Sequence, residues 1–492
     1  MKKTTKNMIC GLLFLMLGEM FVLLWGATAF DLDICAGYCT CKFSTVDCSH
    51  KYFAIIPWSI PNDTKRLDLR NNSLYSIPAY SFKDLLHLQH LDLSLNYLRF
   101  INDLAFVGPT QLLSINLSYS SFSAKDVPKL KGLDYLKNLW ISHCWTGNLP
   151  AYTFRNLTSL QRLDLSEDNI EEVDPEAFIG LDHLEFLDLS GNIFCLSKLD
   201  STVFKPLKSL QTLSFSKTIR DISCEPLKKN MSLSKLRTLR ISDDNFPIDP
   251  LALGIQGLTS LSVKVLLNVT LRGDMFLHVE NLTTLDLDIV PTGSVSLMSD
   301  VFQNFWNLEQ LMVRTSSAAE DELQSILNAI QKCKSLRTIH ISAKLNKISK
   351  RSLRYLGSTE IRELTLELGS GLEIEYYALQ YLPHRLQTMY ILNSPVRFKD
   401  VVYSGFDMLP NLSIFKVLFH DFQTATTRYD IAHISTGSKS TQADKDKISP
   451  LTYINKIKYQ SAYKAFERAN GRKRSNMKSN ERKRFSNRAQ RI

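Results

Sequence analysis

The chain lacks the motifs by which most enzymes and membrane proteins are recognised. Its 492 residues contain no GxGxxG, no phosphate-binding GxxxxGK[ST] loop, no HExxH and no GxSxG. Beyond the first thirty residues, no stretch is long and apolar enough to cross a membrane. No cysteine follows Cys333. We therefore expect neither catalysis nor a resident cofactor or metal.

An excess of charge is also missing from most of the chain. The net charge is +10, but residues 421–492 hold 17 Lys/Arg and 6 Asp/Glu, which leaves −1 for the other 420 residues. The basic character therefore belongs to the C-terminal tail. The sequence pI of about 9.0 does not indicate a nucleic-acid-binding fold.

The first 29 residues follow the pattern of a secretory signal peptide. Lys2, Lys3 and Lys6 precede a mostly apolar run from 8 to 26, and Ala27-Thr28-Ala29 is a small-residue cleavage site. The alternative is an uncleaved membrane anchor, because the run is long enough to span a bilayer. Glu19 in its middle favours cleavage and an extracellular protein. A cell-surface location is the alternative.

A short motif recurs along the chain at a period of 22 to 28 residues. "LDLRNN", "LDLSLN" and "LDLSGN" belong to the consensus L-x-x-L-x-L-x-x-N-x-L. We count fifteen copies, whose cores begin at Leu67, Leu91, Ile115, Leu139, Leu163, Leu187, Leu213, Leu239, Val263, Leu285, Leu311, Ile339, Leu364, Met389 and Phe415.

Each copy predicts one short strand. Leu91 and Leu93 should point inward and Asp92 outward, because side chains alternate along a strand. Asn96 should satisfy backbone groups where the chain turns away. Later in the repeats, three phenylalanines should fill the return side: Phe82, Phe154 and Phe178.

The asparagine position is not uniform. Asn72, Asn96 and Asn192 hold it in early repeats, while the intervening repeats carry Ser120, Cys144 and Asp168. The second half has lost the asparagine, which predicts either degenerate but stable packing or altered curvature that opens a pocket. Helical spacing of apolar residues in 315–335 predicts a helix there, and Cys144 and Cys333 should be buried free thiols.

Four cysteines stand directly before the first repeat, as Cys35-x3-Cys39-x-Cys41-x6-Cys48. Such density in a secreted chain predicts disulfides, whereas a zinc site would favour paired CxxC spacing. The apolar end of a repeat array must be covered, and staples allow a short segment to do so. Cys195 and Cys224, in adjacent repeats, form a further possible disulfide.

Together, the signal peptide, cysteine cluster and 24-residue repeats resemble the extracellular leucine-rich-repeat family, most closely a Toll-like receptor ectodomain. The resemblance implies an α/β repeat solenoid, a horseshoe of about fifteen repeats with a concave parallel β-sheet and an N-terminal disulfide cap. It also implies the pairs Cys35–Cys41 and Cys39–Cys48. The expected domains are signal peptide 1–29, cap 30–62, solenoid 63–425 and a basic, disordered tail 426–492.

The resemblance implies ligand binding in innate immune recognition, by a protein or a microbial, lipid-bearing molecule, with homo- or heterodimers as a further possibility. The chain departs from such receptors in lacking a C-terminal cysteine cap, a transmembrane helix and a signalling domain, so we expect a truncated or secreted form. The alternative is a secreted matrix or adhesion protein that binds glycosaminoglycan or protein partners. Its basic tail would then be an arm for polyanions, rather than a solvated segment or a cover for the last repeat.

Outward positions supply the candidate binding residues, because aromatic residues and arginine dominate binding hot spots. The first set is Tyr119, Trp140, His143 and Glu167, and the second is Arg314, His340, Glu367, Tyr390 and Lys416. Eight N-x-S/T sequons predict glycosylation: Asn62, Asn71, Asn116, Asn156, Asn230, Asn268, Asn281 and Asn411. A sugar on Asn116 would crowd Tyr119 and count against the first set.

Overall fold

In the computed structural model, the chain forms two compact units, each a parallel β-solenoid. The first comprises Met1–Asn245 with Pro250–Gly257, and the second Phe246–Asp249 with Leu258–Ile492. The structure describes residues 34–121, 130–144, 147–194, 200–216, 231, 233–242, 250–251, 253–265, 270–289, 296–315, 320–345, 347–369, 373–375, 378–392, 409, 411–421 and 426–432. The predicted signal peptide, most of the basic tail, Cys195 and Cys224 lie outside these ranges.

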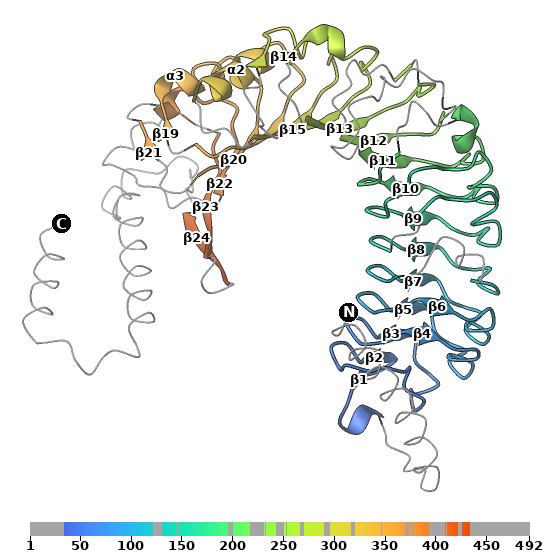
Figure 1. Cartoon of the computed structure of the whole chain (residues 1–492). Coiled ribbons are helices and arrows are strands. Elements are labelled where there is room, and N and C mark those ends of the chain that lie inside the picture. The colour runs from blue at the N-terminus through green and yellow to red at the C-terminus, as the bar shows by residue number, and fades with distance from the viewer. Residues whose placement is uncertain are drawn as a thin grey trace, which may run out of the picture. The chain divides into compact units, whose positions relative to one another are not determined.

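Every predicted repeat core falls on a strand of the main sheet (Figure 1). The first unit contains β3 (Arg66–Asp68), β5 (His90–Asp92), β7 (Ser114–Asn116), β8 (Asn138–Trp140), β9 (Arg162–Asp164), β10 (Phe186–Leu189), β11 (Thr212–Ser216) and β12 (Thr238–Ser242). The second contains β13 (Ser260–Val265), β15 (Thr284–Ile289), β17 (Gln310–Thr315), β18 (Thr338–Ser342), β20 (Glu363–Glu367), β22 (Thr388–Leu392) and β23 (Ile414–Asp421). β24 (Thr426–Ala432) pairs antiparallel with β23.

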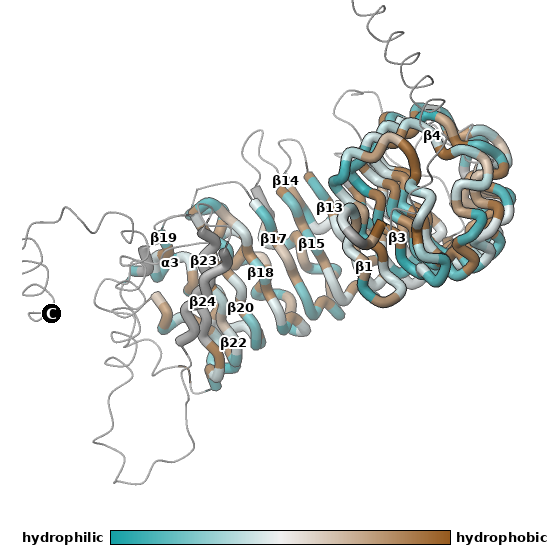
Figure 2. Tube along the Cα trace, turned by 90° about the horizontal axis from the view of Figure 1, so that it is seen from below, coloured by the Kyte–Doolittle hydropathy of each residue, from teal (hydrophilic) through white to brown (hydrophobic). Residues whose placement is uncertain are grey.

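Neighbouring strands pair in parallel with the predicted leucines in register. Leu67 pairs with Leu91, and Leu91 with Ile115. These side chains are at most 2% exposed and form the core, so hydrophobic positions recur from turn to turn in Figure 2. The core predicted at Val263 is wrong by two residues, because Leu261 pairs with Leu285. Leu261, Val263 and Val265 are all buried, so alternation alone does not decide which of them begins the repeat.

Short elements form the return side of each repeat. They are the strand pairs β4 (Ser76–Ile77) with β6 (Phe100–Ile101), β14 (Thr270–Leu271) with β16 (Ser296–Leu297), and β19 (Lys347–Ile348) with β21 (Glu373–Ile374), and the helices α2 (Glu320–Ile330), α3 (Lys350–Leu353), η4 (Ser201–Phe204), η5 (Gly273–Met275) and η6 (Ala378–Tyr381). α2 confirms the predicted helix, with Leu323, Ile326, Leu327 and Ile330 buried. The three predicted phenylalanines are also buried, and the rings of Phe154 and Phe178 stack at 6.1 Å.

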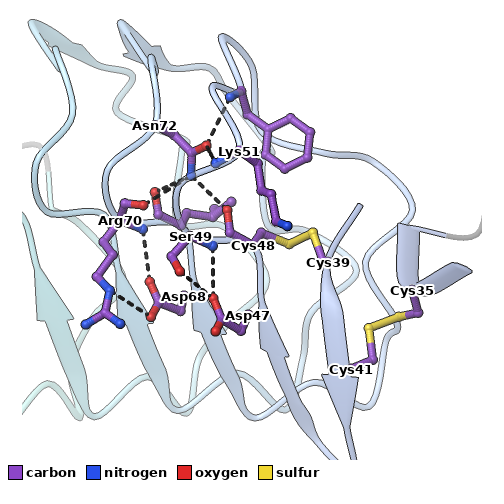
Figure 3. The surroundings of a disulfide bond; sticks show 12 residues. Cys35, Cys39, Cys41, Asp47, Cys48, Ser49, Lys51, Asp68, Arg70 and Asn72 are labelled. Atoms are coloured by element: carbon purple, nitrogen blue, oxygen red, sulfur yellow. Dashed lines mark hydrogen bonds and ion pairs between the residues drawn. A yellow bond between two sulfur atoms is a disulfide. The ribbon is translucent and has the colours of Figure 1, made fainter. Parts of the chain in front are cut away.

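The cysteine cluster caps the first repeat as the resemblance implied (Figure 3). Disulfides join Cys35 to Cys41 and Cys39 to Cys48. After η1 (Ile34–Ala36), β1 (Thr40–Lys42) pairs antiparallel with β2 (Thr45–Asp47), which continues the parallel sheet onto β3. Val46 lies in register with Leu67, so the cap contributes one further layer to the core and covers its end.

Asparagine side chains connect successive repeats, as predicted. Asn96 donates from Nδ2 to the carbonyls of Leu69 at 3.0 Å and Leu93 at 2.9 Å, and its Oδ1 accepts from the N–H of Leu74 at 3.1 Å. Asn72 and Asn192 make equivalent bonds. Each side chain is at most 4% exposed, so these bonds satisfy backbone groups that water cannot reach.

Replacing Asn96 with alanine should destabilise the first unit by about 2–3 kcal/mol, because several buried polar groups lose their partner. Chemical unfolding followed by circular dichroism measures this change. Asn102→Ala is the control, since it removes one exposed turn bond to the N–H of Leu104 and should cost at most about 1 kcal/mol. The stacked residues at the asparagine position of successive repeats are called the asparagine ladder below. Equal effects of the two variants would contradict its structural role.

Candidate functional site

On the outward face of the first unit's sheet, the side chain at one position of each repeat accepts a backbone N–H of the turn that follows the strand. Oδ1 of Asp68, Asp92 and Asp164 accepts the N–H two residues further on, at 2.9–3.0 Å. Asp188 and Asn116 do the same. The acids on this face therefore recur for a structural reason, as the sequence indicated. Trp140 occupies the position on β8, where it cannot accept such a bond, and it is half-buried.

Tyr119, His143 and Glu167, which the repeat pattern predicted at outward positions of the third, fourth and fifth strands, do not lie on strands. They follow β7, β8 and β9 in turns, with φ of 58–59°. Each of these left-handed residues lies three positions after the last residue of its strand, and the 24-residue repeat aligns the three positions in one column. The rings of Tyr119 and His143 stack with centroids 4.2 Å apart. The structure thus brings these two residues together, while Trp140 lies on the sheet face itself.

Glu167 lies against the next turn of the same column. A Cβ added to Gly191 would come within 2.3 Å of the Glu167 carboxyl group, and Gly191 has a φ of 71°. Glycine at 191 therefore leaves room for the Glu167 side chain over the following turn. The glycine of "LDLSGN" is the sequence signal for this arrangement.

Behind this column lie the three ladder positions without asparagine. Cys144 is a buried free thiol, as predicted, and its Sγ donates to the carbonyl of Leu117 at 3.2 Å. Asp168 is fully buried, and its Oδ1 accepts the N–H of Cys144 at 2.6 Å. Within the described part of the chain, its Oδ2 has no hydrogen-bond partner. Burial, opposed by the Cys144 bond and reinforced by Asp164 and Glu167, raises the pKa of Asp168 to about 7. Sequence analysis identified the substitution but not the unpartnered oxygen.

On the second unit, the sheet face carries a polar cluster, defined as Asp286, Arg314, His340 and Glu367. Nη2 of Arg314 lies 2.7 Å from Oδ2 of Asp286, and Oγ of Ser262 donates to the same oxygen at 3.2 Å. Oδ1 of Asp286 is buried, and no hydrogen-bond partner for it lies among the residues that the structure describes. The cluster therefore presents a partly exposed ion pair on the strand face.

His340 and Glu367 extend the polar cluster across two more strands. Nε2 of His340 lies 3.7 Å from Oε2 of Glu367, and both side chains are half-buried. Burial lowers the pKa of His340 despite the neighbouring carboxylate, so the imidazole is neutral at neutral pH and the contact is not an ion pair. Tyr390 belongs to the outward column of His340, two strands further on. The Lys416 backbone pairs with Tyr390, and its side chain lies outside the described residues.

Comparison with known proteins identifies the repeats. A model described as "Leucine rich repeat" matches residues 63–122 and 134–194, and one described as "BspA type Leucine rich repeat region (6 copies)" matches 258–384. The chain belongs to the leucine-rich-repeat family. Its cap, disulfides and relatives are of the extracellular type. Such solenoids present extended surfaces for binding.

Two curated relatives of this leucine-rich-repeat chain are Tsukushi from Gallus gallus and Toll-like receptor 4 from Gorilla gorilla gorilla. Tsukushi is 33% identical over 157 residues, which cover 31% of this chain and 41% of the relative. Toll-like receptor 4 is 30% identical over 234 residues, which cover 46% of this chain and 27% of the relative. The matches therefore span less than half of either relative.

A crystal structure of a TLR13–ssRNA13 complex shares the fold of this leucine-rich-repeat chain. Its TM-score is 0.51 at 20% identity, and the match covers 77% of this chain and 50% of that one. In the described part of the chain, no helix has the length and apolar character needed to cross a membrane. Within the same residues, no group of three or more histidine, cysteine or acidic side chains is arranged to hold a metal.

The sequons occupy two kinds of place in the repeats. Asn62, Asn71, Asn156, Asn281 and Asn411 are exposed and lie outside the strands. Asn116 lies on β7, half-buried, and pairs with Trp140. Asn230 and Asn268 are outside the described residues. Glycosylation of these sites stays a prediction.

Proposed function

We propose that this chain is an extracellular binding module that recognises a protein or microbial ligand on the sheet face of its second unit. The observation that carries the proposal is the polar cluster of Asp286, Arg314, His340 and Glu367. It combines an ion pair and a neutral imidazole whose side chains are partly exposed. A ligand with complementary donors and charges would contact these groups on the sheet face.

The sequence around the polar cluster favours access to it. No sequon occurs between Asn281 and Asn411, so glycans would leave this stretch bare. Similarity to Toll-like receptor 4 supports a role of this kind in innate recognition. Receptor-type pattern recognition is therefore the function we assign to the module.

Arg314→Met should weaken a ligand bound at the polar cluster at least tenfold, because it removes the charged partner of Asp286. The purified chain would be screened by biolayer interferometry against lipopeptides, lipopolysaccharide and a library of secreted proteins. Arg272→Met is the matched control, since Arg272 is exposed and pairs only with Asp274 among the described residues. A ligand insensitive to Arg314→Met would contradict the assigned face, and absence of any ligand would count against the receptor role.

A secreted matrix or adhesion protein is the second candidate function. Similarity to Tsukushi favours it, and so does the basic tail. In that case the chain would be retained on heparin, and deletion of residues 430–492 would abolish retention. Retention that persists after the deletion would exclude the tail as the polyanion-binding segment.

A further inference from the structure

Trp140 stands at the outward strand position where neighbouring repeats have Asp or Asn. It cannot accept the backbone N–H that those side chains accept. The positions before and after it hold Asn116 and Asp164, and each of these accepts the N–H of a following serine. Tryptophan offers no acceptor, so this repeat lacks the side-chain bond to its turn. The inward neighbours Leu139 and Ile141 fill the core without it. The ring therefore presents a large, half-buried apolar surface outward.

Asn116 lies beside Trp140 on the adjacent strand, in register and on the same face. Paired residues in neighbouring strands lie about 4.8 Å apart. Oδ1 of Asn116 accepts the Ser118 N–H at 3.0 Å, and its Nδ2 donates to no group among the described residues. An N-linked sugar is attached through Nδ2 and leaves the amide oxygen as an acceptor, so the turn bond and the modification are compatible.

Among the sequons that the structure describes, this setting is particular to Asn116. The others are exposed on turns outside the main strands, where a glycan extends into solvent. A sugar on Asn116 would instead begin at the sheet surface, next to an aromatic ring. Sugars have an apolar face of C–H groups, which packs favourably on such a ring.

We propose that Asn116 carries an N-linked glycan whose first N-acetylglucosamine packs on the ring of Trp140. The glycan then covers the sheet face of the first unit at β7 and β8. This explains why a tryptophan occupies a position where the side chains of neighbouring repeats accept a backbone N–H of the turn. It also leaves the polar cluster of the second unit as the open sheet face. The inference requires passage through the secretory pathway, as the proposed function does.

Asn116→Asp tests the inference without disturbing the fold. Aspartate at this position makes the same turn bond in neighbouring repeats, but it cannot be glycosylated. The full chain would be produced in animal cells, and glycopeptide mass spectrometry would give the occupancy of each sequon. Hydroxyl-radical footprinting would then measure oxidation of Trp140 in the native protein, in Asn116→Asp, and in Asn156→Asp as the matched control.

We expect Asn116 to be occupied and the oxidation rate of Trp140 to rise at least threefold in Asn116→Asp, with no change in Asn156→Asp. An unoccupied Asn116 beside occupied sequons elsewhere would overturn this inference and leave the proposed function standing. An unchanged oxidation rate would overturn the packing of the sugar on Trp140. Absence of glycan at every sequon would contradict secretion, and with it both proposals.

Discussion

Asp168→Asn raises the free energy of unfolding at pH 8 by roughly 3–4 kcal/mol, the expected result of supplying the missing ladder donor. From the bonds of Asn96 and Asn192 to carbonyls 27 and 3 residues earlier, we expect Oδ2 of Asp168 to take the place of an asparagine Nδ2 and to face the carbonyls of Ile141 and Leu165. A carboxylate cannot donate to these oxygens. A protonated carboxyl group can, and so can an asparagine.

The sign of the pH dependence follows from the raised pKa. Asp168 has a pKa of about 7 in the folded chain, against an ordinary value of 3.8. The native state therefore holds its proton more tightly than the unfolded state. Its contribution to stability is complete below about pH 4, declines as pH rises, and is lost above about pH 7. The variant has no such titration, so the two proteins should differ little at pH 4 and fully at pH 8.

Chemical unfolding at several pH values measures this difference. Asp174→Asn is the control, because the carboxylate of Asp174 is bonded to the N–H of Glu176 in an exposed turn and the change should alter stability by less than about 0.5 kcal/mol. The stability of Asp168→Asn and of the native chain could differ by the same amount at pH 4 and at pH 8. That result would contradict protonation of the Asp168 carboxyl group in the folded chain.

Removing the Cys39–Cys48 disulfide by a double replacement with alanine should destabilise the first unit by about 3–4 kcal/mol. Cross-links of this span contribute about 2–3 kcal/mol through the unfolded chain. The remainder comes from the Cys48 side chain, which is fully buried, so that shortening it to alanine leaves a small cavity. Loss of the bond loosens the layer that covers the end of the core.

Cys35→Ala with Cys41→Ala is the matched comparison. Both cysteines lie further from the first repeat, and Cys41 is half-buried, so we expect a loss of about 2 kcal/mol. Thermal and chemical unfolding of the two variants measure the difference. A larger effect of the outer disulfide than of the inner one would contradict this account of the cap.

The repeat, the strands and the cap were predictable from the sequence alone. Alternating leucines specify one strand face, the 24-residue step specifies parallel register, and clustered cysteines specify a stapled end. The asparagine ladder and the buried thiols of Cys144 and Cys333 were predictable for the same reason, since each depends on one position in a periodic pattern. Only the ninth core failed, where three inward apolar residues made the register ambiguous.

The tertiary structure alone decided how side chains of different repeats meet. It placed Tyr119 and His143 in left-handed turns and stacked their rings, and it left Oδ2 of Asp168 without a donor. It also joined Arg314 to Asp286 across neighbouring strands. Periodicity brings such residues within reach of each other, but backbone conformation and side-chain direction determine which atoms make contact. Those depend on the packed neighbours, which the local sequence pattern does not encode.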